Sequence, residues 1–142
     1  MTRIPLLALA LLAGPAFAGH AFDGADPVQG EALYQEHCAA CHGVTLEGQP
    51  DWRSPGPDGV YPAPPHDETG HTWHHPTAML LDYTKLGGQA ALARAGVTSF
   101  TSGMPAFGDQ LSDRQILDIL AWIASTWPDR IAASQRSRNP EH

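Results

Sequence analysis

The sequence predicts an all-α domain, and two helix signals together with a missing strand signal lead to this prediction. A segment near the C-terminus has a helical apolar period, and a segment near residue 26 has a typical helix start. No convincing strand pattern accompanies them. We expect roughly three to five helices in one small domain.

The first 18 residues have the layout of a secretory signal peptide, because Arg3 precedes an apolar stretch at 4–16 and a small-x-small cleavage site at 16–18. Cleavage there leaves a domain at 19–130, followed by a polar, frayed tail at 131–142. An uncleaved N-terminal anchor is the alternative. The apolar run is short for a membrane span, which takes about 20 residues, and this favours the signal peptide. We therefore expect export to the periplasm without stable membrane insertion.

The other expected helices are separated by two loops. The first helix starts at Asp26-Pro27, where a capping side chain precedes a proline whose missing N–H costs nothing at the first helical position. A long ordered loop rich in Gly, Pro and His follows at 43–76. A short helix at 77–86 and another turn at 89–94 come next, before a second loop at 96–107.

The last helix is the clearest element of the sequence. Ser112 and Gln115 have the spacing of a capping box, and Pro128 ends the helix. Its apolar residues recur at i, i+4, i+7 and i+11 and share one face: Ile116, Leu120, Ile123 and Trp127.

Cys38 and Cys41, the two cysteines of the chain, stand beside His42 in the pattern C-x-x-C-H. On a helix these three residues are one turn apart and project from one face. Two thiols so placed can each add to a vinyl group of a haem, with the imidazole beside them to ligate the iron. The pattern is typical of c-type haem attachment. We therefore predict one covalently bound haem c, held by Cys38 and Cys41.

Three other interpretations of the cysteine pair fit less well. A dithiol redox motif is expected in a βαβ setting, which the chain lacks. A structural zinc site needs four ligands, and the histidines of the 43–76 loop are irregularly spaced. A plain disulfide, which is the default in an exported protein, leaves His42 without a role.

The chain resembles class I cytochromes c, such as the bacterial monohaem proteins, over nearly all of its length after the leader. The resemblance is carried by Gly30, Tyr34 and the segments 38–43, 102–107 and 111–128. In that family the first and last helices cross at a glycine and an aromatic pair. The resemblance places Gly30, Tyr34 and Trp122 at this crossing, where glycine lets two helix backbones approach closely.

His42 is the proximal iron ligand by its place in the motif. Once Met1 is lost with the leader, Met79 and Met104 remain as candidates for the other axial position. Met79 lies in a helical run and is interpreted as core filler. Met104 lies in an irregular loop, from which a thioether can reach a haem pocket, and the resemblance assigns the distal ligand to the same position. A histidine or an open sixth site is the alternative.

The 43–76 loop holds further candidates. Class I cytochromes use a proline carbonyl from this region to hold the proximal histidine, so the resemblance implies Pro64 or Pro65 here. Trp73 is expected either to donate its indole N–H to a haem propionate or to pack over the haem edge. Four imidazoles near two carboxylates would suit copper, zinc or nickel, but their irregular spacing favours a structural role: His66, His71, His74 and His75.

These features and the resemblance imply a periplasmic protein that carries one electron at a time. Asp109, Asp113 and Asp118 are interpreted as capping or exposed helix residues rather than a catalytic carboxylate pair, so no enzyme is expected. The formal net charge of −7 argues against a nucleic-acid partner. The expected partners are redox proteins that meet a monomer at a small, transient interface near the haem edge.

Three other functions stay open at this point. The first is a haem-based ligand sensor, which needs an open or labile sixth position. The second is a haem protein that also handles copper through its histidine-rich loop. The third is a subunit or docked domain of a larger reductase or oxidase, since a fold does not decide among such uses.

Overall fold

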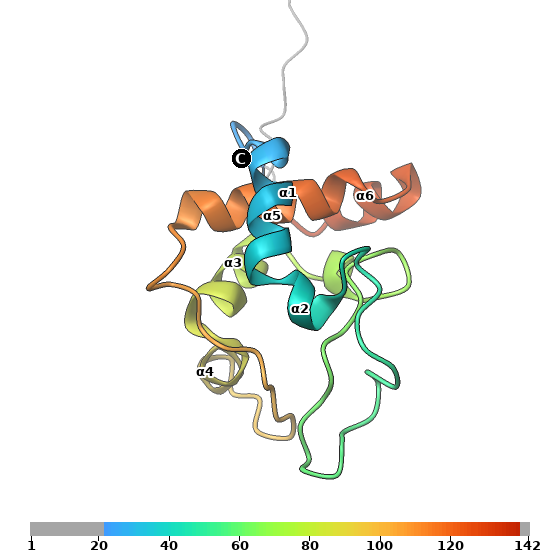
Figure 1. Cartoon of the computed structure of the whole chain (residues 1–142), viewed down its shortest axis with the longest axis vertical. Helices are drawn as coiled ribbons and strands as arrows, with labels where there is room; N and C mark the ends of the chain where they lie inside the picture. Colours follow the sequence, from blue (N-terminus) through green and yellow to red (C-terminus); the bar gives the residue numbers. More distant parts are fainter. Residues whose placement is uncertain (1–21, 140–142) are drawn as a thin grey trace, which may run out of the picture.

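The computed structural model describes residues 22–139 (Figure 1). Within this range the chain forms six α-helices and one 3-10 helix, in the order α1 (Pro27–His37), α2 (Ala39–His42), η1 (Thr72–His74), α3 (Thr77–Leu86), α4 (Gly88–Arg94), α5 (Asp113–Ser125) and α6 (Asp129–Arg136). Residues 22–139 contain no strand, so the all-α prediction is confirmed for them, with more helices than expected. The predicted signal peptide at 1–18 lies outside the described residues. Of the helices described, none has the length and apolar character that a membrane crossing requires.

Helices α1 and α5 cross in close contact, with Gly30 at the crossing (Figure 1). A Cβ atom on Gly30 would lie 1.9 Å from the carbonyl oxygen of Asp118, so only glycine permits this approach. One turn further along α1, the rings of Tyr34 and Trp122 pack with their centroids 4.8 Å apart. The predicted crossing at Gly30, Tyr34 and Trp122 is confirmed.

The start of α1 is tied directly to α5. Asp26 caps α1 with its side chain, and its own backbone N–H donates to Asp118 Oδ1 at 2.7 Å. Arg114 pairs with the same carboxylate at 3.3 Å. The expectation that Asp118 is a capping or exposed residue is wrong, because its side chain is buried between the two helices. Asp109 and Asp113 are exposed, as expected.

Helix α5 has the capping box that the sequence predicts. Ser112 accepts a hydrogen bond from the Gln115 N–H, and the Gln115 side chain accepts one from the Ser112 N–H. The apolar face of α5 packs with α1 and the segments around it into one core of buried residues: Leu33, Tyr34, Ala39, Leu46, Leu111, Ile116, Ile119, Leu120, Ile123, Trp127 and Ile131.

A short helix, α6, replaces the frayed tail that was expected beyond residue 130. Ile131 and Gln135 lie one turn apart on α6, and only 4% and 1% of their surfaces are exposed. The Gln135 side-chain amide donates to the hydroxyl of Thr77 at 3.0 Å, which ties α6 to the start of α3. The tail prediction was wrong because Ile131 is the only large apolar residue after Arg130, which gives no clear helical period, and because a buried glutamine does not register in an apolar pattern.

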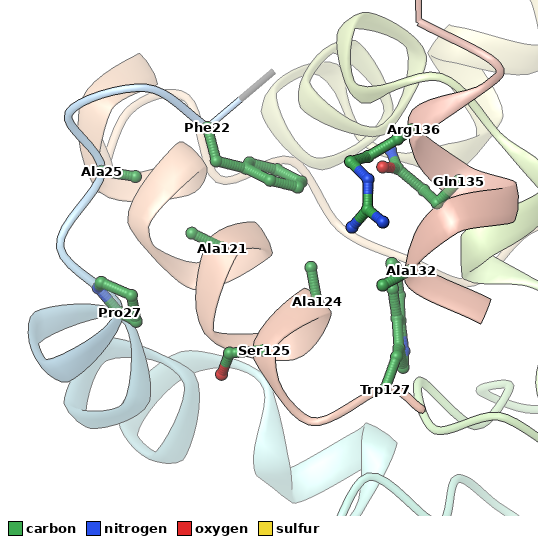
Figure 2. Close-up of a pocket in the computed structure, with 10 residues that line it drawn as sticks. All are labelled: Phe22, Ala25, Pro27, Ala121, Ala124, Ser125, Trp127, Ala132, Gln135 and Arg136. Carbon is green, nitrogen blue, oxygen red and sulfur yellow. The ribbon is translucent and has the colours of Figure 1, made fainter. Parts of the chain in front are cut away.

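A groove of about 360 Å³ runs between the segment before α1, helix α5 and helix α6 (Figure 2). Phe22 and Trp127 supply aromatic surface to it, and Arg136 reaches over it from α6. None of the ligand candidates of the sequence lines this groove. The cysteine motif and Met104 lie away from it, around α2 and in the second long loop.

Candidate functional site

The C-x-x-C-H motif lies where α1 passes into α2. The carbonyl oxygen of Cys38 accepts hydrogen bonds from the N–H groups of Cys41 and His42, at 3.1 and 2.9 Å. The three residues therefore occupy a single helical turn, as predicted. The two thiols are not bonded to each other. Burial, with a smaller contribution from Cys41, raises the pKa of Cys38 to about 11, so its thiol is protonated at neutral pH.

His42 is held in one tautomer. Its side chain is buried, and its Nδ1 lies 2.8 Å from the carbonyl oxygen of Pro64. Since a carbonyl oxygen only accepts, Nδ1 carries the proton and Nε2 keeps its lone pair. Burial lowers the pKa of His42, although the bond to Pro64 partly opposes this, so the ring is neutral at pH 7. Of the two prolines proposed to hold this ring, the structure selects Pro64.

The Nε2 atom of His42 carries the free lone pair of the ring. Among residues 22–139 the ring has its hydrogen bond through Nδ1, to the carbonyl oxygen of Pro64. In this tautomer Nε2 has no proton and can act as an electron-pair donor. The result is a fixed, neutral imidazole with an open lone pair, which is the state that a metal-ligating histidine needs.

Two glycines hold the segment 64–66 against the motif. A Cβ atom on Gly48 would lie 2.4 Å from the backbone nitrogen of Pro65, and one on Gly70 would lie 1.9 Å from its carbonyl oxygen. The Gly48 N–H also donates to the carbonyl oxygen of His42 at 2.7 Å. Because the chain passes this close to itself, the Pro64 carbonyl has a fixed place relative to His42.

Met104 lies in the irregular segment between α4 and α5, as predicted, and its side chain is partly buried. Its carbonyl oxygen accepts from the Gly88 N–H at 3.0 Å, and its N–H donates to Ser102 Oγ at 3.3 Å. The Ser102 hydroxyl also accepts from the Tyr83 hydroxyl at 2.8 Å. These bonds hold the Met104 segment against α3 and α4.

The two long loops meet at Tyr61 and Ser102, which form an isolated parallel β-bridge. The Tyr61 N–H donates to the carbonyl oxygen of Thr101 at 3.2 Å, and the ring of Tyr61 stacks on Phe100 with centroids 4.1 Å apart. The β-bridge and the ring stacking therefore connect the loop that supports His42 to the loop that carries Met104. No motif or apolar period in the sequence indicates this pairing.

The sequence profile described as Cytochrome c matches residues 27–127, which include the C-x-x-C-H motif, the Met104 segment and α5. The chain belongs to the cytochrome c family. This cytochrome is also 32% identical over 105 residues to the Cbb3-type cytochrome c oxidase subunit CcoP of Azospirillum sp. (strain B510). The matched part makes up 74% of this chain and 30% of that protein, so the chain spans less than a third of its relative. No solved structure matches.

The motif residues of this cytochrome fit a c-type haem. Two unbonded thiols one turn apart, beside a neutral imidazole with an open Nε2, form the donor set for covalent attachment and iron ligation. Membership of the family supports a haem-based electron-transfer role.

Three histidines of the 43–76 loop are occupied in ring contacts. His71 stacks on Trp52 and His74 on Trp73, with centroids 5.3 and 3.6 Å apart. His71 and His75 meet edge to face at 5.4 Å. Within residues 22–139 no group of three or more His, Cys, Asp or Glu side chains is placed to hold a metal ion. The copper-handling alternative therefore gains no support from the structure.

The positions of Trp73 and Met79 bear on their expected roles, and packing of Trp73 over a haem edge stays a prediction. The Trp73 indole N–H donates to the carbonyl oxygen of Glu68 at 3.3 Å, within its own loop, so this donor already has a partner. Trp73 is partly buried and packs against the hydrophobic core. Met79 was expected to fill the core, but 39% of its surface is exposed because it lies on the outer side of α3.

Proposed function

We propose that this cytochrome is a periplasmic electron-transfer protein with a single c-type haem and with His42 and Met104 as axial iron ligands. The observation that carries this proposal is the state of His42, which is neutral, fixed through Nδ1 to Pro64 and open at Nε2, directly after Cys41. A histidine in this state can donate its lone pair to iron without first losing a proton.

Different residues of the chain attach the haem, orient the proximal ligand and supply the second ligand. When bound, the haem supplies the exchange of one electron at its iron. Cys38 and Cys41 would hold the group through thioether bonds, while Pro64 orients His42. Met104 offers a thioether sulfur from a segment tied to α3 and α4. Histidine and methionine together give a higher reduction potential than two histidines, which suits a carrier in a respiratory chain.

Three further features complete the proposal. Both cysteines of the chain lie in one motif, which supports one haem per chain. The layout of residues 1–18 supports export to the periplasm and cleavage after Ala18. A carrier of this kind exchanges electrons with other redox proteins at a transient interface and does not itself transform a substrate.

Mass spectrometry after acid–acetone extraction tests covalent attachment. Protein matured in a bacterial periplasm should have the mass of residues 19–142 plus one haem. The double variant Cys38→Ala/Cys41→Ala should lose the attached haem, whereas His37→Gln, next to the motif, should keep it. A wild-type chain that releases its haem on extraction would contradict the proposal, and a mass that includes residues 1–18 would contradict leader cleavage.

The similarity to the oxidase subunit CcoP favours a second candidate, in which this cytochrome works as a domain docked on a larger oxidase. The two candidates differ in the lifetime of the complex. Gentle extraction of native cells followed by size-exclusion chromatography separates them. A carrier elutes at the size of the free chain, and a docked subunit elutes with oxidase activity.

A further inference from the structure

A second imidazole lies directly against His42. The rings of His42 and His66 are stacked, with their centroids 4.1 Å apart and their planes inclined by 24°. The other histidines of this loop contact tryptophans or each other. His66 is thus the member of the group whose ring is engaged with the candidate iron ligand.

The ring of His66 is itself held in place. Its Nδ1 lies 2.7 Å from the hydroxyl of Thr72, a residue that is only 6% exposed. The backbone N–H of His66 donates to the carbonyl oxygen of Leu46 at 2.8 Å, and its carbonyl oxygen accepts from the indole N–H of Trp127 at 2.7 Å. A side chain whose backbone is bonded on both sides and whose ring is bonded to a buried hydroxyl has little freedom to turn.

The hydrogen bond to Pro64 does not fix the plane of the His42 ring by itself. It restrains the rotation of the ring about the Cβ–Cγ bond, but a hydrogen bond tolerates a range of angles, so the ring can still rock about that bond. Such a rotation would drive ring atoms of His42 into the stacked ring of His66, which packing at van der Waals distance resists. The two contacts together leave one orientation of the plane.

We propose that His66, anchored by Thr72, is a positioning residue that sets the rotation of the His42 imidazole plane. This inference rests on the proposed role of His42 as an iron ligand. A leucine of similar size would fill the space but would lack the Thr72 bond that fixes the ring's own rotation. The orientation of an axial imidazole governs how spin density spreads over a ferric haem, so His66 tunes the centre without touching the iron.

Proton NMR of the ferric holoprotein tests this role, because the pattern of haem methyl shifts reports the orientation of the axial ligand planes. His66→Leu should change the spread or order of these resonances. Thr72→Val, which removes only the anchoring hydroxyl, should change them in the same sense by a smaller amount. His66→Phe keeps a stacked ring and should remain nearer to the wild-type pattern. His74→Leu, a loop histidine away from His42, should leave the pattern unchanged.

Two results would overturn the inference. The first is a wild-type methyl pattern in both His66→Leu and Thr72→Val. The second is an equal change in His74→Leu, which would reveal a general effect of altering the loop. A wild-type protein without the spectrum of a histidine-ligated haem would overturn the proposed function together with this inference, whereas unchanged shifts in haem-loaded variants overturn the inference alone. If His66→Leu does not mature, Thr72→Val still decides.

Discussion

A methyl group at Gly30 should force α1 and α5 apart. The Cβ of Gly30→Ala would lie 1.9 Å from the carbonyl oxygen of Asp118, and since ordinary contacts begin at 3.4 Å, the two backbones must separate by about 1.5 Å. Two contacts cross the same junction and would weaken with it. They are the 2.7 Å bond from the Asp26 N–H to the Asp118 carboxylate and the packing of Tyr34 on Trp122.

These contacts set the size of the effect. A hydrogen bond to a charged group contributes about 1.5–3 kcal/mol, and an aromatic pair about 0.5–1.5 kcal/mol. Alanine regains about 1 kcal/mol through its better helix propensity. We therefore expect Gly30→Ala to lower the free energy of unfolding by about 1–3.5 kcal/mol if both contacts are lost.

Denaturant unfolding of the haem-loaded protein, followed by circular dichroism, measures this change. Ala32→Gly on the exposed side of α1 is the matched control, and it should cost about 1 kcal/mol through helix propensity alone. A Gly30→Ala protein that unfolds at the same or a higher denaturant concentration than the wild type would refute the close crossing.

Three other predictions follow from the structure. Ile131→Ala should lower the free energy of unfolding by about 2–4 kcal/mol in the same assay, because Ile131 is the buried apolar side chain of α6, and an unchanged value would mean that α6 is not packed. Burial and neighbouring positive charges lower the pKa values of His71 and His75 below 6.5, so unfolding takes up protons and stability should fall as the pH drops from about 7 to about 5. Thermal unfolding across this range should show a shallower dependence in His71→Gln/His75→Gln, and identical slopes would contradict the assignment. Met104→His should lower the reduction potential measured by redox titration, since imidazole favours ferric iron more than a thioether does, and an equal or higher potential would count against Met104 as a ligand.

The features that the sequence predicted well depend on neighbours within one helical turn or on the size of one side chain. The turn of Cys38, Cys41 and His42 and the capping box of Ser112 and Gln115 follow from helical spacing alone. Their geometry does not depend on the rest of the chain. The crossing at Gly30 was found through the family resemblance, and the close approach of two backbones explains it physically.

The features that the sequence did not predict are pairings between segments that share no period. The stacking of His66 on His42 depends on the path of a loop with more than 20 residues between them, and the same path decides that Pro64 rather than Pro65 holds the ring. The bridge between Tyr61 and Ser102 joins two loops that carry no strand signal. Contacts of this kind become visible only when the backbone is placed in space.

The most direct test of the proposed centre is the near-infrared absorption of the ferric protein, compared between Met104→Ala and Met79→Ala. These are the methionines of the described residues, and Met79 is 39% exposed on α3, which makes it a matched control. We expect the wild type and Met79→Ala to show the weak charge-transfer band of a sulfur-to-iron bond and Met104→Ala to lack it. A band that survives in Met104→Ala, or that is absent from the wild type, would contradict ligation by Met104.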